Sequence, residues 1–229
     1  MGATRKGQVL HKWNEWTFGV RQPRGTVGGM SETPTTVPTM GRRERKKAAT
    51  RQALADAALE LFLEHGYDQV SIRDVAEAAD VSTTTLFKHF PSKEALVFDL
   101  DADQEAALVA AVRERAPGMS VPQALRDHLL GALSFSAEGS EQLATFHQLV
   151  RGTPALTEYH RRMWMRHQHA VAAAIAESAG APADDPRCAA LAHFALEART
   201  LAESSPDPRA TLNAAFDLLE RGWDVVRPG

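Results

Sequence analysis

With 229 residues, 44% of them hydrophobic and 24% charged, and a net charge of −3, the chain has the composition of a globular protein with one small and one larger domain. It contains no run of eighteen apolar residues and no apolar signal-peptide core near its start, which argues against membrane spanning and export and predicts a cytoplasmic location. The single cysteine, Cys188, excludes an intramolecular disulfide and is expected to be a buried, inert thiol.

Charge is distributed unevenly along the chain. Residues 1–51 carry 11 Lys and Arg against 3 Asp and Glu, whereas the remainder carries 15 against 26. A basic segment on an acidic body is typical of a protein that binds DNA through one surface. Residues 1–40 lack helical periodicity and are rich in Pro, Gly and Thr, which predicts a disordered leader with Met30 and Met40 as alternative translation starts. Its basic residues either extend the DNA-binding surface or belong to a tail without a specific role.

A basic cluster follows this leader, and we expect it to act as an arm that neutralises DNA phosphates. It comprises Arg42, Arg43, Arg45, Lys46, Lys47 and Arg51. The helix that comes next ends at Gly66 and has one apolar face. That face carries Leu54, Ala57, Ala58, Leu61 and Phe62.

Residues 71–91 encode two short helices joined by a tight turn. Ser71 is placed to cap the first helix together with Asp74, and Asp80 tolerates the left-handed conformation that the turn requires. Ser82 caps the second helix, and Pro91 ends it. With the helix before them, these segments predict a three-helix helix-turn-helix unit.

The second helix of this pair is expected to read DNA. Leu86 and Phe90 lie four residues apart and point inward, which leaves a hydroxyl-rich and basic face outside. On that face we expect bases to be discriminated by Thr83, Thr84, Thr85 and Lys88. Phosphates are expected to be bound by Lys46, Lys47 and Lys93 and by backbone amides. The other candidate contacts are Ser71, Arg73, Ser82, Phe87 and His89. The alternative is an ordinary polar surface helix.

The stretch from about Leu54 to Leu100 resembles the DNA-binding domain of the TetR family of transcriptional regulators. The resemblance is carried by residues 58–62, 65–67, 70–76, 79–82 and 86–96. Three positions depart from the family pattern: Asp80 stands where Gly is frequent, Phe87 where Tyr is common, and His89 where a second aromatic residue usually follows. Loss of the Tyr hydroxyl removes one phosphate contact, so the operator sequence does not carry over from relatives.

Beyond this domain, Pro at helix starts and Gly at helix ends mark six further helices. They are predicted at residues 92–115, 121–138, 140–151, 154–179, 186–203 and 208–226. The expected fold is therefore all-α with nine helices, as the resemblance also implies. The predicted domains are a leader at 1–40, a helix-turn-helix domain at 41–91, and a helical ligand-binding and dimerisation domain at 92–229.

The resemblance implies a homodimer in which the last two helices of each copy pair. Candidate interface residues are Ala189, Leu191, Ala192, Phe194, Ala195, Leu196, Leu212, Ala215, Phe216, Leu219 and Trp223. The same apolar stripe fits the core of a single chain equally well. A two-fold dimer predicts an inverted-repeat operator with the reading helices roughly 34–36 Å apart.

A pocket for a small-molecule inducer is expected in the larger domain. Its predicted lining is Phe146, His147, Val150, Tyr159, Met163, Trp164 and His167, which combine bulky apolar groups with a few polar ones. Core helices often have the same composition. The neighbouring Arg161, Arg162 and Arg166 fit either an anionic ligand such as an acyl-CoA or a solvated charged face.

Metal and enzyme chemistry find little support in the sequence. His167 and His169 point about 200° apart on a helix, and no nearby Cys or His-Glu-x-x-His pattern completes a site with His160. Neither a phosphate-binding glycine loop nor a nucleophile elbow occurs. We therefore expect no metal, no cofactor and no catalytic residue.

The sequence and the resemblance together predict a ligand-responsive regulator, most often a repressor, that leaves its operator when a small molecule binds. Ligand entry is expected to change the separation of the two reading heads through the helix predicted to begin at Ser92. An activator or a ligand-independent regulator would share this sequence. An all-helical enzyme with an accessory DNA-binding head is the alternative from another class.

Overall fold

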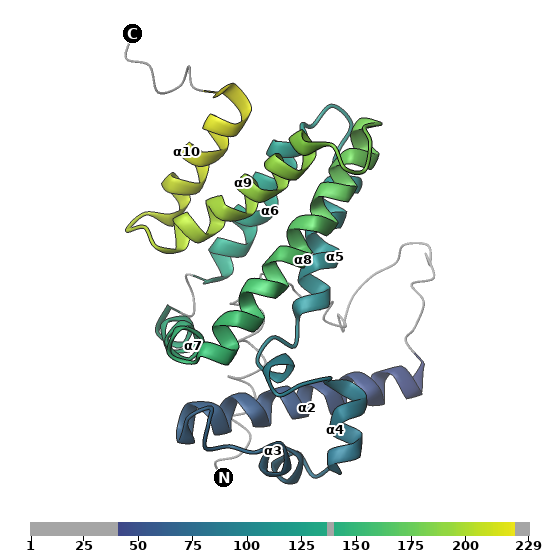
Figure 1. The fold of residues 1–229 in the computed structure, drawn as a ribbon, viewed down its shortest axis with the longest axis vertical. Coiled ribbons are helices and arrows are strands. Elements are labelled where there is room, and N and C mark those ends of the chain that lie inside the picture. Colours follow the sequence, from purple (N-terminus) through teal and green to yellow (C-terminus); the bar gives the residue numbers. More distant parts are fainter. Residues whose placement is uncertain (1–40, 137–139, 223–229) are drawn as a thin grey trace, which may run out of the picture. The chain divides into compact units, whose positions relative to one another are not determined.

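The structure, a computed structural model, describes residues 41–136 and 140–222. The predicted leader at 1–40, Trp223 and the last residues of the final predicted helix lie outside the described residues. Within the described ranges the chain forms nine α-helices and one 3₁₀ turn, and no strand occurs there (Figure 1). The predicted all-α fold is confirmed. The described chain divides into two compact units, 41–99 and 100–222.

The first unit contains α2 (Arg42–His65), α3 (Ile72–Ala78), α4 (Thr83–His89) and the 3₁₀ turn η1 (Glu94–Leu96). Helix α2 contacts each of the other three elements (Figure 1). Its apolar face supplies the centre of a small core, as the spacing predicts. Fully or almost fully buried side chains of this core are Leu54, Ala58, Phe62, Val75, Leu86, Phe90, Leu96 and Phe98.

Local hydrogen bonds define the helix-turn-helix. The Ser71 hydroxyl accepts the Asp74 N–H at 3.2 Å, and an Asp74 carboxylate oxygen accepts the Ser71 N–H at 2.8 Å, which completes a capping box. Asp80 has φ +53°, the left-handed conformation that the sequence predicts for the turn. Ser82 then caps α4 by accepting the Thr85 N–H at 3.1 Å. The two predicted caps and the predicted turn are confirmed.

Two expectations about helix boundaries were wrong. The basic cluster does not precede the first helix as a separate arm, because α2 begins at Arg42 and contains it. The helix predicted at 92–115 is also interrupted: after η1 the chain turns, and α5 (Asp101–Arg113) begins only at Asp101. Residues 95–100 are all buried. A regular helix on a surface buries only one face, so a turn is needed to bury six consecutive residues.

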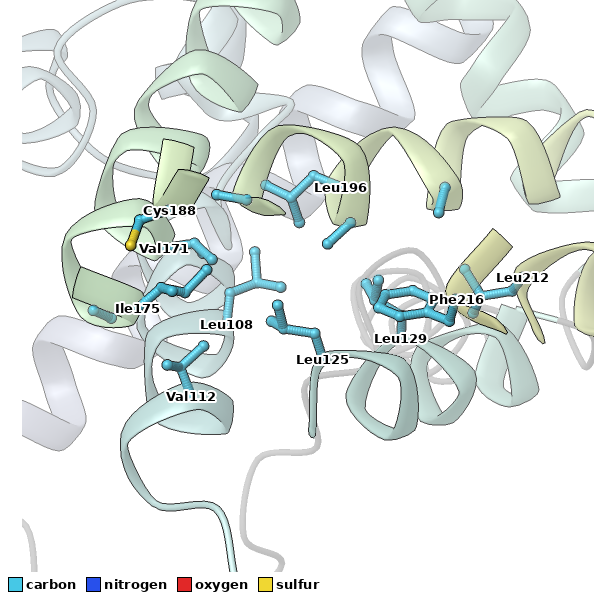
Figure 2. Close-up of a cluster of buried hydrophobic side chains, with 14 of the residues drawn as sticks. Leu108, Val112, Leu125, Leu129, Val171, Ile175, Cys188, Leu196, Leu212 and Phe216 are labelled. Atoms are coloured by element: carbon cyan, nitrogen blue, oxygen red, sulfur yellow. The ribbon is translucent and has the colours of Figure 1, made fainter. Parts of the chain in front are cut away.

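The second unit contains α5, α6 (Val121–Ser136), α7 (Ser140–Gly152), α8 (Pro154–Ala179), α9 (Pro186–Glu203) and α10 (Pro208–Arg221). Helices α8, α9 and α10 each begin with proline, at the positions that the sequence predicts. Helix α8 packs between α5 and α9, and α10 packs against α9 and α6 (Figure 1). Figure 2 shows the apolar core that these helices share, with Leu108, Leu125, Val171, Leu196 and Phe216 among its buried side chains. Cys188 is buried at its edge.

Candidate nucleic-acid interface and ligand cavity

Helix α4 presents one face to solvent and the other to the core of the first unit. Leu86 is fully buried, whereas Thr83, Thr84, Phe87 and Lys88 are exposed, with Phe87 54% exposed. This exposed face therefore combines hydroxyl, aromatic and cationic side chains on one short helix. In the major groove, hydroxyl and ammonium groups can form hydrogen bonds with base edges, and threonine methyls and an aromatic ring can contact thymine methyls.

Other predicted DNA contacts are occupied by local capping. The Ser82 and Thr85 hydroxyls lie 2.9 Å apart, and Thr85 is only half exposed. The Ser71 hydroxyl donates to Asp74 at 2.8 Å. These groups shape the helix-turn-helix, whereas Arg73 on α3 and Lys46 and Lys47 on α2 are exposed.

Arg51 holds the end of α4 against α2. Its guanidinium donates to the His89 carbonyl at 2.6 Å and to the Asp99 carbonyl at 2.7 Å, and it lies 4.1 Å from the centre of the Phe90 ring. The sequence suggests a phosphate contact for this residue, but the structure uses it inside the unit. Free carbonyls at a helix end need such a donor, and an arginine offers several at once.

His89 and Lys93 are less accessible than the sequence suggests. Burial, together with the positive charges of Arg51 and Lys47, lowers the pKa of His89, so its ring is neutral near pH 7. Lys93 donates to the Tyr67 carbonyl at 2.5 Å, with its ammonium group 4.0 Å from the Tyr67 ring centre. Burial lowers the pKa of Lys93 as well. Lys93 lies just before the η1 turn and not in the first turn of a long helix.

A cavity of about 290 Å³ lies among α7, α8 and α9 in the second unit. Four of the seven predicted lining residues contribute to it: Phe146, His147, Val150 and Trp164. The other lining residues, which sequence reasoning missed, are Arg151, Thr157, His160, Arg199, Thr200, Glu203 and Ser204. Three of these seven, Arg199, Thr200 and Glu203, lie on α9, a helix for which the sequence suggests the dimer interface or the core of a single chain.

The cavity joins an aromatic pair to an ion pair. Trp164 donates from Nε1 to His160 Nε2 at 2.6 Å, and Arg199 donates from Nε to Glu203 at 2.7 Å. The Arg199 guanidinium carbon lies 5.2 Å from the Trp164 ring centre. Burial lowers the pKa of His160 to about 4, and Glu203 only partly opposes this. The Trp164 N–H is a donor only, so His160 Nε2 is the unprotonated nitrogen and the ring is neutral.

Three predicted lining residues do not line this cavity. Met163 and His167 are fully buried, and Tyr159 is half-buried. His167 Nε2 lies 2.7 Å from an Asp101 carboxylate oxygen, which ties α8 to the start of α5. Burial raises the pKa of Asp101, but the His167 hydrogen bond and the Arg166 charge outweigh this and leave it below its usual value.

The neighbouring arginines pair on the surface. Arg161 and Arg162 lie 2.9 and 3.5 Å from Glu158, and Arg166 pairs with Asp101. All three arginine side chains are at least half exposed. These contacts fit a solvated charged face better than a site for an anionic ligand.

An apolar groove of about 710 Å³ runs along α9 and α10. The exposed side chains of Phe194, Leu201 and Leu218 line it, together with half-buried Ala215 and Leu219. By contrast, Ala192, Ala195, Leu196, Leu212 and Phe216 are buried within the single chain. Some residues of the predicted apolar stripe therefore belong to the core of the single chain, and others line the groove. Ala189 is exposed and Leu191 packs against the core; Trp223 lies outside the described residues.

The described residues contain neither a membrane-spanning helix nor a group of metal-ligating side chains. No helix in residues 41–136 or 140–222 is long and apolar enough to cross a membrane. In the same ranges, no three His, Cys, Asp or Glu side chains are grouped so that they could hold a metal ion.

Both units of the chain match family models of known proteins. Residues 54–100 match the model of bacterial regulatory proteins of the tetR family, and residues 119–224 match the MftR C-terminal domain. The regulator MftR of Mycobacterium tuberculosis is 28% identical over 194 residues, which cover 82% of this chain and 98% of that protein. The HTH-type transcriptional regulator TcmR of Streptomyces glaucescens is 32% identical over 165 residues, 68% of this chain and 73% of that protein. The solved structure of Salmonella enterica GusR has a TM-score of 0.49 at 19% identity and covers 77% of this chain and 96% of that chain.

The capped helix pair, the exposed face of α4 and the helical second unit define a helix-turn-helix DNA-binding transcriptional regulator. The chain belongs to the TetR family of bacterial transcriptional regulators. Regulators of this family bind operator DNA and small molecules and work as dimers.

Proposed function

We propose that this chain is a homodimeric repressor that a small molecule in the α7–α8–α9 cavity releases from an inverted-repeat operator in the cytoplasm. The observation that carries the proposal is the exposed face of α4. Thr83, Thr84, Phe87 and Lys88 on this face are uncovered, whereas the Ser82–Thr85 cap and the Arg51 clamp fix the helix beneath them. A rigid helix with an uncovered reading face costs little ordering entropy when it enters a major groove.

In this proposal the DNA contacts fall into two groups. Lys46, Lys47 and Arg73 are exposed and bind phosphates, which gives affinity without sequence preference. Thr83, Thr84, Phe87 and Lys88 contact base edges, with the ring and the methyl groups directed at thymine methyls. The remaining candidates support the fold of the first unit, called the reading unit below, and make only secondary contacts with DNA. They are His89, Lys93, Ser71, Ser82 and Thr85.

A second copy of the chain is proposed to cover the α9–α10 groove. Phe194, Leu201 and Leu218 are exposed large apolar residues, and they lie together in this groove. Burying them between two copies would be favourable by about 25 cal/mol per Å² of apolar surface. Leu201→Glu should therefore turn a dimer into a monomer in light scattering, whereas Leu63→Glu, at a half-buried position on α2, should not. A Leu201→Glu protein that stays dimeric would contradict this interface.

The test of the whole proposal begins with selection of bound fragments from the host genome. We expect enrichment of a symmetric site. Fluorescence anisotropy of that site, titrated with small-molecule fractions of the host, should then show release by at least one fraction. Absence of a symmetric site would contradict operator binding, and full occupancy with every fraction would contradict ligand release.

A matched pair of variants locates the effect in the cavity. Val150→Trp fills the cavity from α7, whereas Gln148→Trp adds the same side chain at an exposed position of that helix. The first should bind the operator normally and ignore the active fraction. The second should behave as the unmodified protein. Equal release of both variants would place the ligand elsewhere.

A further inference from the structure

The cavity among α7, α8 and α9 has one apolar wall and one charged wall. Phe146, Val150 and Trp164 form the apolar part, and Arg199 and Glu203 form the charged part. The Arg199 side chain is only 11% exposed, although it carries a permanent charge. A charge this deeply buried needs a counter-charge, and the Glu203 carboxylate lies 2.7 Å from it.

Glu203 is a poor permanent partner for Arg199. It is the last residue of α9, where the helix dipole disfavours a negative charge. Its side chain is 29% exposed, so the pair is partly accessible to water. Burial raises the pKa of Glu203, but Arg199 outweighs this and keeps the carboxylate ionised. The carboxylate of a ligand can therefore occupy the position beside the Arg199 guanidinium that the Glu203 carboxylate now occupies.

The other polar residues of the cavity add positive or neutral character. Arg151 lies at the exposed side of the lining, and burial keeps both His147 and His160 neutral by lowering their pKa values. Among the described lining residues, two guanidinium groups thus face one carboxylate. A cationic ligand would add to the positive charge of these two guanidinium groups, whereas an anion would supply the kind of charge that Glu203 places beside Arg199.

We infer that the cavity binds a small organic acid with an apolar body, whose carboxylate replaces Glu203 on Arg199. The apolar body lies against Phe146, Val150 and Trp164, and the acid group forms a charge-assisted hydrogen bond with the guanidinium. A volume of about 290 Å³ is at the small end of ligand sites. This inference rests on the proposed function, because it names the chemical class of the inducer.

The test uses three probes with one body and different head groups: 4-phenylbutanoate, 4-phenylbutanamide and 4-phenylbutylamine. Calorimetric titration of the full chain should show the acid binding at least about ten-fold more tightly than the amide, since only the acid forms a hydrogen bond with the guanidinium in which both partners are charged. Arg199→Met should reduce the affinity for the acid to the affinity for the amide. Arg113→Met is the matched control, because Arg113 forms an exposed ion pair with Glu177 at 2.7 Å outside the cavity, and it should change nothing.

Glu203→Gln separates this inference from a purely structural ion pair. If Glu203 competes with the ligand, its removal should tighten acid binding several-fold and leave amide binding unchanged. If the pair only stabilises the cavity, the same variant should weaken both probes. Equal binding of all three probes, weaker acid binding in Glu203→Gln, or no binding of the acid would overturn the inference. None of these outcomes decides the proposed function, which depends on release of operator DNA by host fractions.

Discussion

The two units of the chain build their sites in opposite ways. In the reading unit, the exposed face of α4 spans residues 83–88, and the caps that shape it lie within fifteen residues of one another. In the second unit, the residues that line the cavity lie on or next to three helices and are spread from residue 146 to residue 204. A locally encoded surface can be recognised in a sequence, whereas a cavity depends on how distant helices pack.

The two sites also differ in how their polar groups are used. The hydroxyls of Thr83 and Thr84 and the ammonium group of Lys88 are exposed on α4. In the cavity, Trp164 already donates to His160, and Arg199 already donates to Glu203. A surface that meets DNA has solvated groups to exchange, but a cavity must keep its buried groups paired until a ligand replaces a partner.

The largest effect that tests this difference is expected at Arg51, which joins α2 to the carbonyls of His89 and Asp99 in the first unit. Arg51→Met removes the donor of the His89 and Asp99 carbonyls and should destabilise the first unit by about 3 kcal/mol. Hydrogen exchange should accelerate in α3 and α4 but not in α8. Arg43→Met, at an exposed position of α2, is the control. Unchanged protection of α4 would show that local capping alone holds the reading unit.

The next effect concerns acid stability of the second unit. Burial lowers the pKa of His160 to about 4, below its usual 6.5, so the neutral ring stabilises the fold above pH 6.5 and this contribution is lost as the pH falls toward 4. Between pH 7 and pH 5 the loss is about 2 kcal/mol. His160→Gln cannot titrate, so its free energy of unfolding should fall less over this range, as measured by urea denaturation. Parallel pH profiles would show that His160 is not buried as a neutral ring.

Most of the fold was predictable because its signals are short-range. Ser71 with Asp74, Ser82, Asp80 and the prolines at 154, 186 and 208 each act within one helical turn, and the structure confirms them. The interruption after Ser92 was missed. Helix-like spacing continues through residues 95–100, and only tertiary packing buries all six of them.

The cavity was only partly predictable for the same reason. The sequence predicts Phe146, His147, Val150 and Trp164 in the lining because they are bulky residues on helices expected to be central. Met163 and His167 have the same character but face the core, where His167 meets Asp101. Arg199 and Glu203 were missed, although their spacing of four residues on one helix is a signal for an ion pair. Nothing in that spacing says that the pair faces a cavity.

The division of DNA contacts gives a smaller but sharper test. Lys88→Ala should weaken operator binding by about 1–2 kcal/mol and flatten discrimination at one base pair, because the side chain lies on the reading face of α4. Lys46→Ala is the matched variant on α2, and it should weaken all sequences alike and reduce the salt slope by about one. Competition binding against single-base operator variants at several salt concentrations distinguishes them. Identical profiles for the two variants would contradict the assignment of Lys88 to bases.

The smallest effect concerns the turn at Asp80, where the sequence departs from the family pattern. A side chain at φ +53° crowds its own backbone, and glycine avoids that cost. Asp80→Gly should stabilise the first unit by about 0.5 kcal/mol, since the relief is partly offset by the greater freedom of glycine in the unfolded chain. Asp80→Ala should destabilise it by about 1 kcal/mol, because alanine has the same crowding and no polar side chain to bond locally. Hydrogen exchange of α3 and α4 measures the stability of the first unit in the unmodified protein and the two variants and so ranks them. If alanine were as stable as aspartate, the turn would owe its conformation to packing around α3 and α4 and not to the residue itself, and the reading unit would be less locally encoded than its sequence suggests.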